Sequence, residues 1–268
     1  MENTCSYEQK KNYKPSVVRS YSSAILLMVL LMTMMFSCRK SPLTNGDTIT
    51  ETRELSSFCC LYLNDNIDVT LVNSDIFKIE ITTGENLMPN IISDVIDDAL
   101  YIRNENICNW LRSYDYPLEA RIYYSGDIKE IIYESVGGLR TEGYLENDST
   151  RFMLYVENGA GDIDLKLNCD SIFIDIHEGT NDIKLEGSSN YTYIYQQGFG
   201  PVNAANLPSS KMFVNSHTDN NIFIYCTDNL DARIYNSGNI YYKGQPEINS
   251  YISPDALGRL IEIENLKN

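Results

Sequence analysis

The sequence predicts an all-β protein whose C-terminal half is a stacked β-solenoid. Three observations support this fold class: five short turns of similar composition, an almost constant spacing between them, and strands with a two-residue period beside them. The turns close at Ile163, Ile183, Val202, Ile222 and Ile240, so the steps between them are 20, 19, 20 and 18 residues. A fixed period near 20 residues, built on strands, is typical of repeat proteins whose coils stack on one another.

Composition explains why the chain turns at these points. Two residues before each closing apolar residue the sequence holds only Gly or Asn, which tolerate a left-handed backbone, so we expect positive φ at Gly161 and Gly238. The next position holds Asp or Asn, except at Pro201, and short Asx side chains bond nearby backbone groups. The predicted turn residues are Gly159, Gly161, Asp162, Gly179, Asn181, Asp182, Gly198, Gly200, Asn220, Asn221, Gly238 and Asn239.

Strands flank each turn. Apolar and polar residues alternate from Ile163 to Leu167 after the first turn, and Phe152 to Val156 and Ile172 to Ile176 precede the first two turns. Alternation with period two indicates a strand with one buried face, so each coil should supply two strands and two corners. A β-sandwich with ordinary hairpin turns is the alternative, but five aligned turns of one composition favour the solenoid.

The N-terminal 37 residues have the pattern of a signal peptide. Basic residues precede an apolar run from Ala24 to Phe36, which at 13 residues suits a signal-peptide core and falls short of the roughly 20 needed to cross a bilayer. The run ends at Ser37 and Cys38, which resembles a bacterial lipoprotein signal and implies cleavage before Cys38 and its acylation. Met35 and Phe36 depart from the usual pattern, and a short uncleaved anchor is the alternative.

The remaining chain divides into three parts. Residues 38–52 are polar and aperiodic and should form the lipidated Cys38 and a flexible tether; residues 53–250 form the solenoid domain, whose N-terminal part is β-rich but less regular; residues 251–268 form a C-terminal cap or tail. A short helix is expected over Pro89 to Val95. Arg39 after the cysteine favours the outer membrane by analogy, whereas the choice between the periplasmic and the external face stays open.

Charge and composition narrow the classes of function. Loss of residues 1–37 removes four basic and two acidic residues and takes the net charge from −16 to −18, which disfavours nucleic acid and anionic lipid as partners. The five cysteines beyond Cys38 and the signal region form no disulfide framework; adjacent Cys59 and Cys60 should point to opposite faces. The sequence predicts no cofactor, no metal and no catalytic set.

Two groups of residues are candidate metal ligands. His177 and His217 occupy nearly equivalent places two coils apart, roughly 10 Å, too far to share a metal, and solvent-facing positions are the simpler interpretation. Asp162, Asp164 and Asp182 offer carboxylates for a shallow calcium site, yet the sequence lacks the calcium-binding nonapeptide repeat.

The chain resembles the putative auto-transporter adhesin, head GIN domain family. The resemblance rests on Asn66 to Val69, Gly84 to Leu87, Asp98 to Ile102, the run of turns, and Tyr242 to Pro246, over roughly Arg53 to Ile248. It implies a right-handed parallel β-helix without a catalytic set and with a role in adhesion. The implied function is a non-catalytic, lipid-anchored envelope protein that binds a glycan or an envelope protein; the alternative is a structural component that self-associates as a homo-oligomer.

The chain holds 20 tyrosines, and this excess points to a ligand platform. Tyr191, Tyr193 and Tyr195 alternate on one strand and therefore share one face; facing outward they would bind a ligand, and facing inward they would fill the core. Thr48, Ser149 and Ser171 each follow an Asp in a three-residue pattern that matches an O-glycosylation signal.

Overall fold

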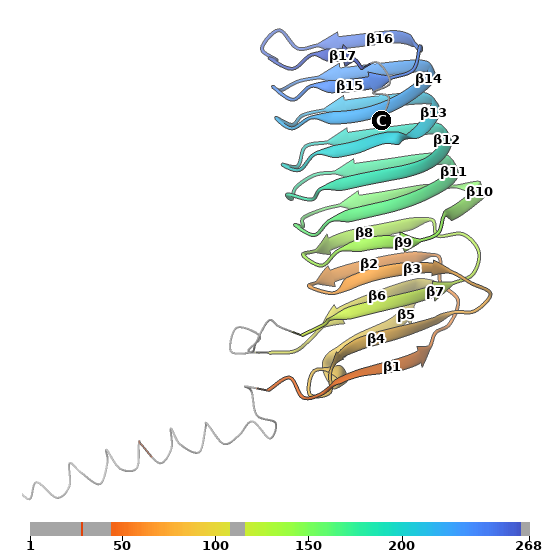
Figure 1. The fold of residues 1–268 in the computed structure, drawn as a ribbon, viewed down its shortest axis with the longest axis vertical. Coiled ribbons are helices and arrows are strands. Elements are labelled where there is room, and N and C mark those ends of the chain that lie inside the picture. The colour runs from red at the N-terminus through yellow and green to blue at the C-terminus, as the bar shows by residue number, and fades with distance from the viewer. Residues whose placement is uncertain (1–27, 29–43, 108–115, 264–268) are drawn as a thin grey trace, which may run out of the picture. The chain divides into compact units, whose positions relative to one another are not determined.

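A computed structural model of the chain describes residues 28, 44–107 and 116–263, with the side chains of 148–150 left out. The residues from Thr44 onward form one compact unit of strands, stacked in a column from β1 to β16 and β17 (Figure 1). The strands are β1 (Thr48–Glu54), β2 (Cys60–Asp65), β3 (Asp68–Asn73), β4 (Lys78–Gly84), β5 (Ile91–Ile96), β6 (Ala99–Asn104), β7 (Glu119–Tyr124), β8 (Glu130–Ser135), β9 (Leu139–Glu142), β10 (Leu145–Val156), β11 (Ile163–Ile176), β12 (Ile183–Gln196), β13 (Val202–Ser216), β14 (Ile222–Ile234), β15 (Ile240–Lys243), β16 (Glu247–Ile252) and β17 (Leu260–Glu262).

A typical coil is built on β11. Alternate residues of its first half, from Ile163 to Cys169, are buried, and so are alternate residues of its second half, from Ile172 to Ile176. Exposed Asp170 lies at the bend between the halves. The two strands expected for each coil are therefore one long bent strand in β11 to β14, and the second corner is a bend within it.

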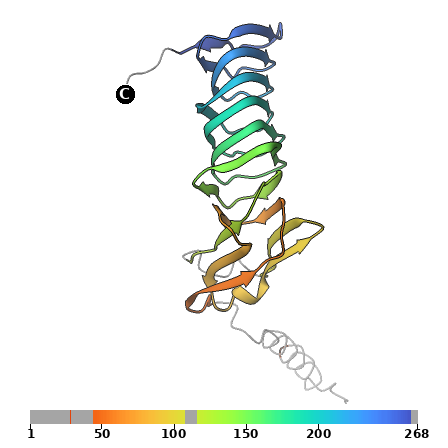
Figure 2. The same ribbon diagram turned by 90° about the vertical axis from the view of Figure 1, so that its right-hand side faces the viewer.

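The coils stack in parallel with in-register pairing. Ile163 pairs with Ile183, Ile183 with Val202, Val202 with Ile222, and Ile222 with Ile240, so the predicted closing residues form one buried column. Full burial of such a side chain stabilises the fold by about 1.5–3 kcal/mol relative to exposure. The predicted β-solenoid is confirmed, and Figure 2 shows its coils from a second direction.

Two walls of hydrogen-bonded strands enclose the core. The first wall, in stacking order, contains β7, β3, β9, the first halves of β11 to β14, β15 and β17. The second wall contains β6, β2, β8, the second halves of β10 to β14, and β16.

The predicted turn residues lie between the long strands, as expected, but the reason given for their glycines is wrong. Neither Gly161 nor Gly238 has positive φ, and among the corner glycines only Gly179 does, at 108°. A Cβ at Gly161 would lie 2.2 Å from the carbonyl oxygen of Gly137, and one at Gly238 would lie 2.1 Å from that of Asn220. At these two corners glycine is required because the backbone of the neighbouring coil passes too close for a Cβ.

Asparagine takes the same place by a different means. Asn181 is buried and its Nδ2 donates to the Gly161 carbonyl 2.7 Å away, while Asn220 Nδ2 donates to the Phe199 carbonyl. At the next position, Asn221 Oδ1 accepts the Asn239 N–H at 3.2 Å. The Asx side chains thus bond across coils and satisfy backbone groups that the corner leaves unpaired.

The N-terminal coils do not stack in sequence order. Strand β2 lies between β6 and β8, and β3 lies between β7 and β9. The first coil of the chain is therefore inserted between the second and the third, as the order of strands along the column in Figure 1 shows. Cys60, at the start of β2, has its Sγ 3.7 Å from that of Cys59, so the two thiols do not diverge as expected, and burial together with the Cys59 thiol raises the pKa of Cys60 to about 11.

Antiparallel strands close the N-terminal end. Strand β4 pairs with β7, β1 pairs with β4, and β5 pairs with β6. β1 begins at Thr48, within the range 38–52 assigned to the tether. The helix expected over Pro89 to Val95 is wrong, because a 3-10 turn, η1 (Met88–Asn90), leads directly into β5.

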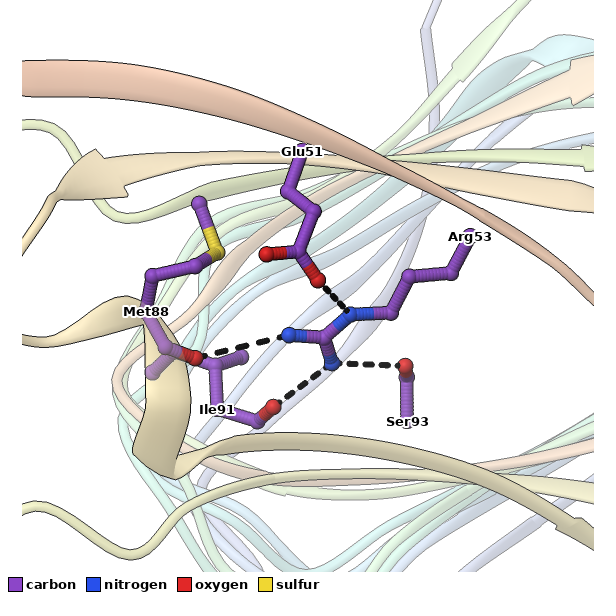
Figure 3. A network of polar contacts seen from close by, with 5 residues as sticks. All are labelled: Glu51, Arg53, Met88, Ile91 and Ser93. Carbon is purple, nitrogen blue, oxygen red and sulfur yellow. Dashed lines mark hydrogen bonds and ion pairs between the residues drawn. The ribbon is translucent and has the colours of Figure 1, made fainter.

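Arg53 connects parts of this N-terminal end by hydrogen bonds (Figure 3). Its Nη1 donates to the Ile91 carbonyl at 2.7 Å and to Ser93 Oγ at 3.0 Å, and its Nη2 donates to the Met88 carbonyl at 3.4 Å. Glu51 accepts from Nε at 2.6 Å. One guanidinium therefore connects β1 to η1 and β5.

Candidate binding face

The three alternating tyrosines face outward from the second wall. Tyr191, Tyr193 and Tyr195 are half-buried, whereas the residues between them, Thr192 and Gln196 among them, are buried. Thr192 Oγ1 bonds Ser209 Oγ at 2.8 Å, and Gln196 Nε2 donates to the Gly200 carbonyl at 2.6 Å. Internal hydrogen bonds let these polar residues occupy the core, which leaves the tyrosines on the surface.

Tyr193 belongs to a central column of large side chains. It pairs in register with Phe173 on one side and Phe213 on the other, with ring centroids 5.8 and 5.4 Å away. Two guanidiniums flank the column: Arg151 lies 5.4 Å from the Phe173 ring centroid and Arg233 lies 4.7 Å from that of Phe213. Cation–π contacts of this kind hold the long basic side chains flat against the aromatic surface.

A second column of rings runs beside the corners. Its members, each in contact with the next, are Tyr155, His177, Tyr195, His217, Tyr235 and Tyr251. Successive centroids lie 4.9, 5.4, 5.4, 4.2 and 5.7 Å apart. The His217 and Tyr235 rings are nearly parallel, at 7°. We call the two columns together, with Tyr191, the aromatic face.

Sequence reasoning found the two histidines but missed what lies between them. Both are at strand ends as expected, yet Tyr195 fills the gap, so the histidines are members of a continuous stack. A signal for this was present: Tyr155, Tyr195 and Tyr235 each stand at the end of a strand, close to the residue that opens the next corner.

Burial favours the neutral form of three rings of the aromatic face. Burial, followed by the nearby Asp175 carboxylate, raises the pKa of Tyr193, and burial raises that of Tyr191. Burial lowers the pKa of His217, which favours neutral imidazole. His177 Nε2 lies 3.2 Å from the Asp175 carboxylate. At neutral pH Tyr191 and Tyr193 are therefore hydrogen-bond donors on the aromatic face.

The three corner carboxylates line a hollow of about 390 Å³ on the first wall, but Lys184 lies among them. Its Nζ is 3.7 Å from Asp164 and 2.9 Å from Glu186. Across residues 44–107 and 116–263, no three His, Cys, Asp or Glu side chains are grouped as a metal ion would require.

The remaining sequence-predicted sites are scattered. Thr48 is exposed in β1, and half-buried Ser171 lies beside the bend of β11, where its hydroxyl donates to Asp170 at 3.1 Å. Cys38 lies outside the described residues, and so does the side chain of Ser149.

The fold and the face define a parallel β-solenoid with an outward aromatic surface and an N-terminal antiparallel cap. The family model described as "Putative auto-transporter adhesin, head GIN domain" matches residues 57–246, and the chain belongs to this family. No curated protein matches the chain at a significant level. Among the described residues, no helix is long and apolar enough to span a membrane.

Solved structures share the fold. A putative adhesin from Bacteroides fragilis has a TM-score of 0.70 at 20% identity, covering 81% of this chain and 97% of its own. A putative lipid binding protein from Parabacteroides distasonis has a TM-score of 0.63 at 21% identity, covering 82% and 98%. A putative adhesin from Parabacteroides merdae has a TM-score of 0.59 at 19% identity, covering 82% and 98%. At these identities the likeness establishes the fold alone.

Proposed function

We propose that this chain is a non-catalytic, adhesin-like binding module of the cell envelope, and that the aromatic face binds its ligand, a glycan or an envelope protein. Membership of an adhesin family supports an envelope or surface role. The single observation that carries the site is the continuous stack of rings on the second wall, which runs from Tyr155 to Tyr251.

The face has the chemistry of a recognition surface. Tyrosine offers a large contact area at low conformational cost, because only two side-chain torsions need to be fixed, and its hydroxyl donates hydrogen bonds. Here the rings are already fixed by their neighbours, so binding loses little further entropy. Arg151 and Arg233 add charge at the margin of the surface.

Anchoring is the second part of the proposal. The apolar run that ends at Cys38 supports lipidation at that residue and attachment to the outer membrane. Several acyl chains on one cysteine would hold the protein firmly, because a single chain gives only marginal binding.

A glycan-array and pull-down screen with residues 44–268 tests the binding role. It is run beside a Tyr193→Ala, Tyr195→Ala variant and a matched control, Phe223→Ala, Tyr241→Ala, which removes a stacked aromatic pair 4.9 Å apart on the first wall. We expect binding that is lost in the first variant and kept in the control. Binding that survives in the first variant rejects the aromatic face, and no binding at all by the wild type favours the structural role.

A further inference from the structure

The C-terminal end of the solenoid exposes its core. Ile248 and Ile252 of β16 pair in register with Leu230 and Ile234 of β14, so they continue the inward-facing rows of the second wall. Leu230 and Ile234 are each 1% exposed, whereas Ile248 and Ile252 are 42% and 44% exposed. An apolar row that is fully covered in the coil below is thus open to solvent in the last coil.

The backbone of β16 is unpaired on the same side. Within residues 44–107 and 116–263, β16 pairs only with β14, and β17 only with β15. The Ser253 N–H donates to the Ile234 carbonyl, so odd-numbered residues of β16 face β14. Because strand residues alternate, the N–H and C=O groups of Ile248, Ser250 and Ile252 face the open end. An unpaired edge of this kind is a template for another strand.

The opposite end of the solenoid is built differently. There β4 and β1 add antiparallel strands to β7, and β5 adds one to β6. Five of the seven residues of the outermost strand, β1, are exposed, and its sequence is polar. A C-terminal end placed there would meet a mostly polar, exposed strand instead of a second apolar row, so the surface that best fits an open C-terminal end is another C-terminal end.

The sequence of β16 is self-complementary in antiparallel pairing. A twofold axis through Ser250 places Ile248 opposite the partner's Ile252 on the core side, and Asn249 opposite the partner's Tyr251 on the outer side. Glu247 then meets the partner's Ser253, so no like charges stand directly opposite one another. Ile248, Ser250 and Ile252 point their side chains inward and also have unpaired N–H and C=O groups. Side-chain packing and backbone hydrogen bonding therefore favour the same register.

We propose that two copies of this chain associate end to end through β16, as an isologous twofold dimer. With a strand of about 20 Å and walls about 10 Å apart, the end covers on the order of 200 Å² per copy, about a quarter of what each partner contributes to a standard interface. The full chain carries a net charge of −16, and residues 44–268, without six basic and two acidic residues, carry −20, so the copies repel one another at low salt. The dimer is accordingly weak, and added salt strengthens it.

Sedimentation velocity over a concentration series of residues 44–268 tests the proposal. Ser250→Pro removes an N–H that points away from β14, and prolines are tolerated at such edge positions. Ile248→Lys, Ile252→Lys places charges on the open row, and Ile96→Lys, at a 53% exposed isoleucine of β5, is the matched control. Far-ultraviolet circular dichroism and melting confirm that each variant is folded.

We expect a monomer–dimer equilibrium for the wild type and Ile96→Lys. Association should be at least roughly tenfold weaker in Ser250→Pro, because two hydrogen bonds across the axis are lost. A wild type that stays monomeric at every concentration and salt overturns the proposal. So does dimerisation that survives both end variants, or growth into long filaments. If the dimer proposal fails, the proposal that the aromatic face binds a ligand is unaffected, because that proposal is tested at Tyr193 and Tyr195.

Discussion

Replacing Gly161 by Ala tests the principle on which the corners are built. The new methyl group would lie 2.2 Å from the Gly137 carbonyl oxygen and 2.4 Å from the Tyr133 hydroxyl. The Tyr133 hydroxyl donates to the Gly137 carbonyl at 2.5 Å, so neither atom can move without loss of a buried hydrogen bond. Overpacking typically costs about 1–3 kcal/mol and the hydrogen bond about 0.5–1.5 kcal/mol, so we expect a loss of about 2–4 kcal/mol.

Thermal unfolding followed by circular dichroism measures this loss. For a domain of this size the change corresponds to a decrease in Tm of roughly 5–15 °C. Gly143→Ala is the control, because Gly143 has a φ of 85° but nothing within 4 Å of an added Cβ. It should cost only about 1 kcal/mol. If Gly161→Ala melts like the wild type, or if Gly143→Ala is the more damaging change, the close approach of coils is not what selects glycine.

Three further outcomes are expected. Arg53→Lys should loosen β1, because the fork that reaches three backbone and side-chain acceptors is lost; faster hydrogen exchange in β1 and β5, with the β11 to β14 coils unchanged, would show this at a cost of about 1–3 kcal/mol. Burial lowers the pKa of His217 below its usual 6.5, so the unfolded chain binds more protons than the folded chain, and stability should fall as pH drops below about 6.5. His217→Gln should flatten that part of the stability–pH curve. An unchanged curve would exclude His217 as the cause of the fall. Cys38→Ser should release the protein from the membrane fraction, and membrane association that persists without any acyl label on the wild type would reject the lipid anchor.

The coil period could be predicted from the sequence because every coil needs the same types of residue at the same places. Each closing residue, such as Ile163 or Ile183, must be apolar to enter the core, and each corner must hold a small residue or an Asn. The reason for glycine at Gly161 could not be read from the sequence, because the atoms that crowd it belong to Gly137 and Tyr133, more than 20 positions earlier. Local backbone preference suggested positive φ, and tertiary packing supplied a different cause.

The insertion of β2 between β6 and β8 had no local signature either. Leu61 and Leu63 of β2 are buried at alternate positions in the same way as Ile131 and Tyr133 of β8. Strands with equal patterns can exchange neighbours without changing which face is buried. Their order is therefore decided by connections and capping, which a pattern of single strands does not contain.

The direction of the tyrosines could not be decided from their strand alone. Both faces of the strand carry polar atoms: hydroxyls on Tyr191, Tyr193 and Tyr195, and the side chains of Thr192 and Gln196 on the other face. Hydrophobic pattern alone therefore gave no answer. The choice depends on partners for the buried polar groups, namely Ser209 and the Gly200 carbonyl, which come from later parts of the chain.

Footprinting of tyrosines by hydroxyl radicals, with and without a ligand recovered from the binding screen, tests the central claim most directly. The aromatic face as the binding surface predicts protection of Tyr193, Tyr195 and Tyr235 when ligand is bound, with Tyr241 on the first wall unchanged. Protection of Tyr241 while the three tyrosines of the second wall stay as reactive as in the free protein would contradict it.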